Sequence, residues 1–149
     1  FSTLHANDAV SGLIRLVDLG IEPYLVGAGL NCLLAQRLVR KICPHCSKPA
    51  RISPRLAAAA AGRRIDVEGI RQATGCPDCG ETGYKGRMGI FQMLEVTNEI
   101  SEALIRRPAL SELTALAKSQ GMTTMRQDGI AKVLEGKTTI DEVLRVTVE

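Results

Sequence analysis

The sequence has no tryptophan, and its 149 residues include only two tyrosines and two phenylalanines. Four aromatic rings are too few to build the stacking platform with which proteins hold single-stranded nucleic acid, so we expect no nucleic-acid partner. No apolar run is long enough to span a bilayer. The chain opens on FSTLH, without a start methionine, a basic segment or a long apolar segment, so we expect a piece of a longer protein rather than a secretory signal.

The composition is that of a soluble globular protein, with 45% hydrophobic and 23% charged residues. The length corresponds to one domain, or to a domain with a small satellite. Five cysteines, an odd number, fit a reducing cytoplasm better than an oxidising exterior, where an unpaired thiol is a liability.

Two Cys-x-x-Cys pairs are the most informative motif: Cys43 with Cys46, and Cys76 with Cys79. Two residues between ligands let both sulfurs of a pair reach one ion at about 2.3 Å, and two pairs complete a tetrahedron. The pattern predicts a structural Zn²⁺ held by four thiolates, with no coordination position left open for water. The 29 residues between the pairs exceed the roughly 12 to 20 of common zinc fingers and ribbons, so thiol redox chemistry or a disulfide stays open as an alternative.

Charge is unevenly distributed. From residue 37 to residue 87 the sequence holds eleven Lys or Arg and four Asp or Glu, whereas the rest holds eight basic and twelve acidic residues. The net charge of +3 therefore hides a basic middle between acidic ends. Such a middle suits contact with phosphates, anionic lipid or the acidic region of a neighbouring copy, although an ordinary solvated surface has the same composition.

Hydrophobic periodicity predicts two helices before the first cysteine pair. Residues 7–19 form an amphipathic pattern capped by Asn7 or Asp8. A second helix is expected over residues 23–40, apolar over much of its surface, with Cys32 buried and inert inside it.

Between the cysteine pairs we expect only a short Ala-rich helix at residues 55–61. A segment with so few large apolar side chains cannot bury a core, so the metal is expected to hold it together.

After the second pair, residues 88–94 predict a strand. A capping box is expected at residues 139–142, and four helical patterns follow the strand, at 98–106, 109–120, 123–135 and 140–146. The fold class is therefore mostly α with a short β element.

Several separated motifs closely resemble the C-terminal part of the type II secretion and type IV pilus assembly ATPases. The resemblance covers essentially the whole chain, and the tetracysteine segment lies where that family carries it. The residues that carry it are 2–9 (STLHANDA), 34–40 (LAQRLVR) running into 43–46 (CPHC), 83–90 (GYKGRMGI), 126–129 (RQDG) and 142–147 (EVLRVT).

The resemblance implies a fold in three parts: the end of a RecA-like α/β ATPase core at residues 1–42, a tetracysteine zinc-binding insert at 43–87, and a helical C-terminal subdomain at 88–149. It implies a cytoplasmic hexamer at the inner face of the bacterial inner membrane, associated with the membrane through secretion or pilus platform proteins. Such a motor uses ATP and Mg²⁺ to drive pilus or pseudopilus assembly. The same motor type serves both systems, so the resemblance does not separate them.

The resemblance also assigns candidate roles. A strand ending at Thr3 to His5 would lie beside the nucleotide, with His5 sensing or polarising the γ-phosphate and Thr3 supporting it by a hydrogen bond. Without the resemblance, a lone histidine in such a place is more often structural. The sequence lacks the GxxxxGK[ST] loop that cradles phosphates, so we predict that this chain alone neither binds ATP tightly nor hydrolyses it.

Three arginines, Arg37, Arg40 and Arg87, are candidates for contacts between subunits, because guanidinium pairs well with carboxylate or phosphate. Arg87 is the strongest of them, although a surface arginine without a role is an equal alternative.

A different class of function is a zinc-stabilised adaptor that binds a protein or nucleic acid and has no ATPase ancestry. An adaptor would bury the apolar surface of its first two helices, whereas a motor fragment would expose it. A zinc hydrolase needs an open metal position, and four cysteine ligands argue against one; His45 could replace a thiolate without opening the site.

Overall fold

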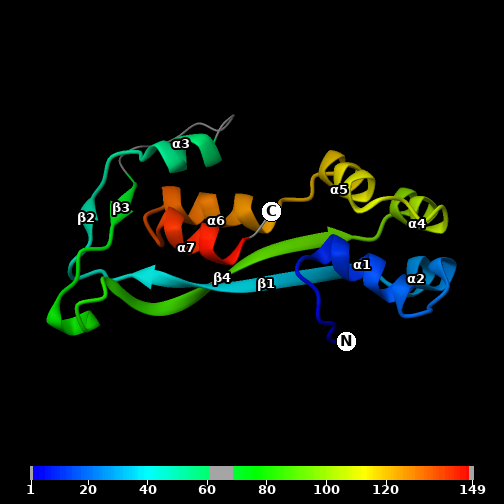
Figure 1. Ribbon diagram of the computed structural model, residues 1–149, viewed down its shortest axis with the longest axis horizontal. Coiled ribbons are helices and arrows are strands. Elements are labelled where there is room, and N and C mark those ends of the chain that lie inside the picture. Colours follow the sequence, from blue (N-terminus) through cyan, green and yellow to red (C-terminus); the bar gives the residue numbers. More distant parts are fainter. Residues whose placement is uncertain (1, 61–68, 148–149) are drawn as a thin grey trace. The chain divides into compact units, whose positions relative to one another are not determined.

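The computed structural model describes residues 2–60 and 69–147. The chain divides into two compact units, one formed by Phe1–Gln36 with Phe91–Thr124 and the other by Arg37–Ile90 with Met125–Glu149. We call them the first and the second unit. Strands β1 (Cys32–Ile42) and β4 (Tyr84–Glu95) are hydrogen-bonded neighbours in a two-stranded sheet, and each contributes residues to both units. Their arrows run in opposite directions in Figure 1.

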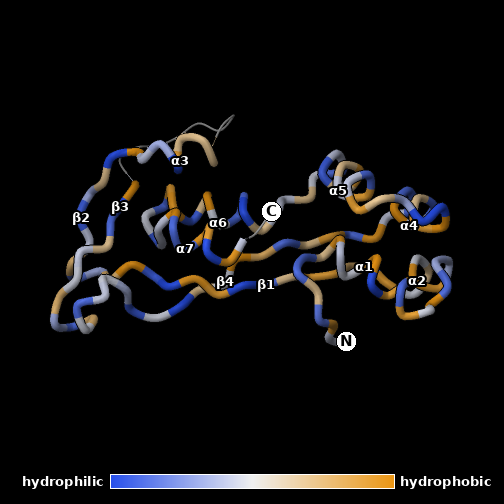
Figure 2. The backbone as a smooth tube through the Cα atoms, in the orientation of Figure 1, coloured by the Kyte–Doolittle hydropathy of each residue, from blue (hydrophilic) through white to orange (hydrophobic). Residues whose placement is uncertain are grey.

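The first unit packs four helices against its share of the two strands. The helices are α1 (Ala9–Asp18), α2 (Pro23–Gly29), α4 (Asn98–Ile105) and α5 (Leu110–Ser119). Hydrophobic and hydrophilic residues alternate along these helices in Figure 2. Their apolar residues form one buried cluster, in which the most deeply buried side chains are Leu13, Ile100 and Leu113. The core of this unit therefore joins segments that lie about ninety residues apart.

Helix α1 confirms the expected amphipathic helix and its cap. The carboxylate of Asp8 accepts hydrogen bonds from the backbone N–H groups of Val10 at 2.9 Å and of Ser11 at 3.0 Å. The hydroxyl of Ser11 accepts a hydrogen bond from the Asp8 backbone N–H, so these three amides at the beginning of the helix are satisfied.

The predicted helix over residues 23–40 is wrong beyond its first two turns. Helix α2 ends at Gly29, and strand β1 begins at Cys32. Glycine favours helix poorly, and the residues that follow can pair with β4, a partner that local periodicity does not reveal. Cys32 is consequently exposed rather than buried inside a helix.

The remaining helices after the strand agree with the sequence to within one or two residues: α4, α5, α6 (Met125–Leu134) and α7 (Ile140–Val146). The strand itself is longer than predicted. Helix α3 (Pro54–Ala59) occupies the Ala-rich segment, of which Ala61 lies outside the described residues. Residues 2–6 form neither helix nor strand, so these residues do not show the strand that the resemblance implied to end at Thr3 to His5.

The second unit carries the cysteine pairs, the short antiparallel pair β2 (Lys48–Pro49) with β3 (Arg71–Gln72), and the helices α3, α6 and α7. Its apolar cluster joins residues between the cysteine pairs with residues of the last two helices: Leu56, Ala60, Ile70, Ile130, Val133, Ile140 and Val143. The expectation that the metal alone holds the insert together is therefore wrong, because the insert shares a hydrophobic core with α6 and α7. Among the described residues, no helix has the length and apolar character needed to cross a membrane.

Candidate metal centre

Two loops bring the four cysteines together in the second unit. Cys43 directly follows the end of β1, whereas Cys76 is the N-cap and Cys79 the last residue of a single 3₁₀ turn, Pro77–Cys79. The backbone N–H of Cys43 donates to the carbonyl of Gly83 at 2.9 Å, which ties the first loop to the end of the second. Cys43 is fully buried, and the other three cysteines are partly exposed.

The sulfur positions fit a tetrahedral ion. A metal with four sulfur ligands at about 2.3 Å holds those sulfurs about 3.8 Å apart. The Sγ atoms of Cys43 and Cys76 lie 3.9 Å apart, those of Cys46 and Cys79 lie 3.9 Å apart, and those of Cys76 and Cys79 lie 3.7 Å apart. All four ligand atoms lie within 4.8 Å of one another. None of these cysteines forms a disulfide, so the four sulfurs converge as the spacing predicts and the residues fit the ion.

Backbone amides are aimed at two of the sulfurs. Gly75 N–H donates to Cys46 Sγ at 3.3 Å, while the N–H groups of Cys76 and Gly83 donate to Cys79 Sγ at 3.2 Å each. Gly75 has a φ of +109° and an added Cβ there would lie 2.7 Å from the carbonyl oxygen of Glu81, so this donor position requires glycine. Such donors stabilise thiolate, the form that binds metal.

These contacts give the thiols of Cys46, Cys76 and Cys79 different pKa values. Desolvation raises the pKa of Cys79, but the hydrogen bonds from Cys76 and Gly83 outweigh it and lower that pKa to about 6. The pKa of Cys46 is lowered in the same way, against desolvation, chiefly by the bond from Gly75. Desolvation and hydrogen bonding to Cys79 raise the pKa of Cys76 to about 12. A metal ion that binds all four sulfurs therefore has to displace a proton from Cys76.

His45 lies outside the four-sulfur cluster. Its Nδ1 faces the Asp78 carboxylate at 3.8 Å, across the two loops, and both side chains are more than half exposed. The histidine is therefore positioned as a neighbour of the metal centre, and the set of ligand atoms that lie together consists of the four cysteines.

A charged network joins β1 to α7 and was not foreseen as a unit. Glu142 of α7 is buried, and its carboxylate accepts hydrogen bonds from the guanidinium groups of Arg40 and Arg145 at 2.8 Å each. The expected capping box is only half formed: Thr139 Oγ1 accepts from the Glu142 N–H at 3.4 Å, but the carboxylate accepts from the backbone of Arg40 at 3.0 Å. In the sequence, the spacing of Thr139 and Glu142 indicated a helix cap, but it did not show that the Glu142 carboxylate pairs with Arg40 on β1.

Of the remaining candidate residues, Arg40 alone is placed in this network by the contacts of the described residues. Arg37 and Arg87 are exposed on β1 and β4. Arg40 is about half exposed and is bonded to Glu142 within the same chain. Thr3 and His5 are exposed in the irregular segment before α1. The structure brings none of these five described residues into the cysteine cluster.

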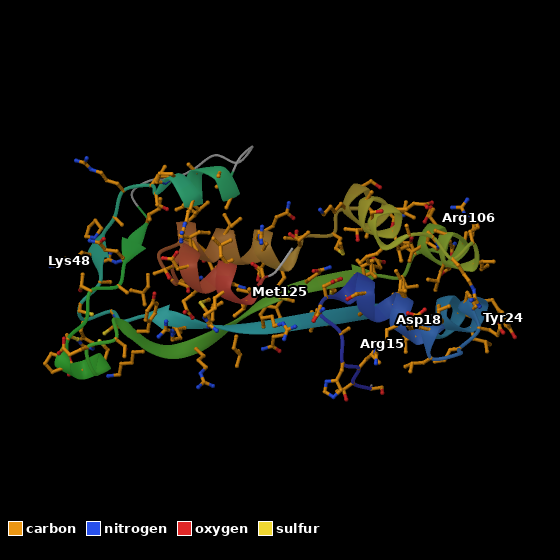
Figure 3. All side chains as sticks on the ribbon, viewed as in Figure 1. Arg15, Asp18, Tyr24, Lys48, Arg106 and Met125 are labelled. Atoms are coloured by element: carbon orange, nitrogen blue, oxygen red, sulfur yellow. The ribbon has the colours of Figure 1, made fainter. Side chains whose placement is uncertain are left out.

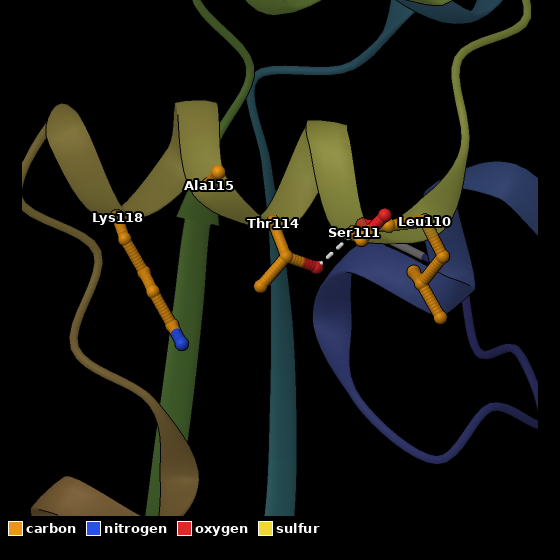
Figure 4. Close-up of a pocket in the computed structure, with 5 residues that line it drawn as sticks. All are labelled: Leu110, Ser111, Thr114, Ala115 and Lys118. Carbon is orange, nitrogen blue, oxygen red and sulfur yellow. Dashed lines mark hydrogen bonds between the residues drawn. The ribbon is translucent and has the colours of Figure 1, made fainter.

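A hollow beside α5 carries no comparable chemistry. Its lining comes from one face of that single helix, where Thr114 Oγ1 donates to the Leu110 carbonyl at 2.7 Å (Figure 4). The lining residues are Leu110, Ser111, Thr114, Ala115 and Lys118.

Comparison with known proteins adds the family context. A family model described as "Type II/IV secretion system protein" matches residues 1–145. The type IV pilus assembly ATPase PilB of Thermus thermophilus is 39% identical over 150 residues, which cover 99% of this chain and 17% of that protein. The type II secretion system protein HxcR of Pseudomonas aeruginosa is 40% identical, over 98% of this chain and 28% of its own length. The type IV pilus assembly ATPase TfpB of Acinetobacter baylyi is 42% identical, over 97% of this chain and 25% of its length. The chain thus spans less than a third of each of these relatives.

Proposed function

Because the chain belongs to the family of type II/IV secretion system proteins, we propose that it is the C-terminal portion of a motor ATPase that powers type II protein secretion or type IV pilus assembly. The proposal includes a hexameric parent protein in the cytoplasm, docked on inner-membrane platform proteins. It also keeps the division into an ATPase-core end at 1–42, a zinc insert at 43–87 and a C-terminal subdomain at 88–149. The observation that carries it is the match over residues 1–145 combined with four sulfurs at tetrahedral spacing.

In this proposal the cysteines have a structural role. Four sulfurs leave no ligand position for water, so a bound Zn²⁺ supplies cross-linking of the two loops rather than hydrolysis. The amides of Gly75, Cys76 and Gly83 hold the sulfurs in place, and the shared core with α6 and α7 fixes the insert to the end of the chain. The insert thereby becomes a rigid surface for a partner.

The nucleotide chemistry of the parent would need residues outside this sequence. No phosphate-binding loop occurs in the 149 residues, so ATP and Mg²⁺ would be held by other parts of a longer protein. Exposed His5, supported by Thr3, is proposed to face the γ-phosphate there.

The adaptor alternative is not favoured. The turn after α1 and the beginning of α2 expose apolar side chains: Leu19 and Tyr24 are each 60% exposed, with exposed Ile21 and Leu25 beside them in the sequence. Figure 3 labels Tyr24, which lies at the beginning of α2. A self-contained adaptor would bury such residues, so the exposure supports a fragment of a larger assembly.

The test compares the 149-residue chain with the longer protein that contains it. We expect the longer protein to hydrolyse ATP, and the chain alone to show no micromolar ATP affinity by calorimetry. Both should hold one zinc per chain by mass spectrometry of metals, and the double variant Cys46→Ser, Cys79→Ser should hold none. An exposed-cysteine control, Cys32→Ser, should keep its zinc. Failure of the longer protein to hydrolyse ATP would refute the motor, and zinc-free wild-type chain would refute the metal centre.

A further inference from the structure

A tyrosine joins the cysteine centre to the beginning of α7. Gly83 donates to Cys79 Sγ at 3.2 Å and accepts from the Cys43 N–H at 2.9 Å, so this residue touches both cysteine loops. The next residue, Tyr84, places its hydroxyl 2.9 Å from Thr139 Oγ1. Thr139 is the N-cap of α7. Gly83, which contacts the sulfurs, is therefore adjacent to a tyrosine that bonds a helix cap fifty-five residues further along the chain.

Strand β1, which ends directly before Cys43, also contacts Tyr84 and the beginning of α7. The guanidinium of Arg40 lies 4.1 Å from the centroid of the Tyr84 ring, at cation–π distance, and bonds Glu142 at 2.8 Å. Backbone groups of β1 add two bonds: Thr138 Oγ1 donates to the Arg40 carbonyl at 2.8 Å, and Ile42 N–H donates to the Lys137 carbonyl at 3.0 Å. Ile42 directly precedes the ligand Cys43.

Helix α7 depends on such contacts. It has seven residues, and a helix shorter than about 12 residues is marginal in water without tertiary packing. Its apolar face packs in the core of the second unit through Ile140 and Val143. Its N-terminal end is held by the groups on Tyr84, Arg40 and β1.

We infer that the cysteine centre and the beginning of α7 form one cooperative unit, in which Tyr84 and Arg40 couple metal occupancy to the docking of α7. The inference rests on the proposed metal binding. Without metal, the loops of Cys43 and Cys79 lose their cross-link, and the positions of Gly83, Tyr84 and Ile42 are no longer fixed. The hydroxyl of Tyr84 and the N–H of Ile42 then leave the segment 137–139, so α7 opens more often. By reciprocity, weakening the Tyr84 contact lowers the affinity for metal.

Hydrogen exchange on the intact 149-residue chain tests the coupling. Removing the metal with a chelator should speed exchange of the α7 amides more than about tenfold. Helix α4 of the first unit is the internal control, because none of the contacts described above joins it to the cysteines, and its exchange rates should stay unchanged. Tyr84→Phe keeps the ring and removes the hydroxyl. With zinc bound at one per chain, this variant should already exchange faster in α7, and a competition titration should show weaker zinc binding.

The matched control is Tyr24→Phe, which removes the hydroxyl of an exposed tyrosine in the first unit. It should behave as wild type, and Thr139→Ser, which keeps the cap hydroxyl, should retain most of the protection. The coupling is overturned if chelation leaves α7 unchanged in zinc-loaded wild type, if α4 responds as strongly as α7, or if Tyr84→Phe matches Tyr24→Phe. A chain without zinc would overturn the metal centre as well, so the metal content separates the two failures.

Discussion

At the scale of single residues, the most constrained charge is the carboxylate of Glu142. Its side chain is only 3% exposed and it meets two arginines that are each about half exposed. Desolvation raises its pKa, but the hydrogen bonds from Arg145 and Arg40 outweigh desolvation and lower the pKa to about 2. Because the folded pKa lies below the ordinary value of 4.5, this group contributes stability above about pH 4.5, and the contribution is lost as pH falls towards 2.

Glu142→Gln should therefore destabilise the chain at neutral pH by about 2 to 3 kcal/mol, since the charge that both arginines face disappears. The difference between variant and wild type should shrink between about pH 5 and pH 2. Urea unfolding followed by circular dichroism at each pH measures it. Asp141→Asn removes the neighbouring carboxylate, which is 71% exposed and pairs with Arg55 at 3.3 Å, and should change stability little. A constant difference across this pH range would contradict the role of the Glu142 charge.

At the scale of elements, glycines set how closely helices approach. Gly129 of α6 faces α7, and a Cβ added there would lie 2.6 Å from Cγ1 of Val143. Gly27 of α2 is similarly close to Ser101 of α4, at 2.7 Å from its Cβ. Both positions need the absence of a side chain for packing, and neither has the left-handed backbone that a turn requires.

Gly129→Ala should lower the free energy of unfolding by roughly 1 to 3 kcal/mol, because Val143 must move within a packed core. Thermal unfolding followed by circular dichroism measures the loss. The control is Gly29→Ala at the end of α2, where an added Cβ would meet no atom within 4 Å; it should be neutral or slightly stabilising. Equal melting temperatures for Gly129→Ala and Gly29→Ala would show that α6 and α7 are not closely packed at Gly129.

Elements also show where local sequence patterns are sufficient and where they fail. The capped helix α1 and the helices α4 to α7 follow from periodicity and caps, which act within a few residues. The segment 30–42 is apolar enough for either helix or strand, and only pairing with β4 makes it a strand. Arg40, one of the two arginine partners of Glu142, lies on that strand, so the wrong helix assignment concealed this pairing.

At the scale of the whole molecule, the two units differ in charge. The second unit holds fifteen Lys or Arg and nine Asp or Glu, whereas the first holds four and seven. Four thiolates and one Zn²⁺ would subtract two charges, which leaves the second unit basic. Opposite charges on the two units support the proposal that exposed arginines such as Arg37 and Arg87 meet acidic residues of another copy.

Arg87→Ala in the longer protein should lower ATP hydrolysis that depends on assembly, because the guanidinium would no longer reach its acidic or phosphate partner in the neighbour. The zinc content and the melting of the monomer should stay unchanged. Arg106→Ala, in the first unit at the end of α4, is the matched control and should keep full activity (Figure 3). Loss of zinc in Arg87→Ala would show instead that this arginine supports the metal centre.

The sequence alone determined the features that depend on spacing and neighbouring residues. Two Cys-x-x-Cys pairs indicated four ligands for one ion, and the separated motifs indicated the family. Tertiary structure decided what depends on contacts between distant segments: the strand β1, the core that the insert shares with α6 and α7, and the pairing of Glu142 with Arg40. The reason is physical, because caps and ligand spacing are fixed by a few adjacent residues, whereas strand pairing and burial are fixed only when residues about fifty to a hundred positions apart meet.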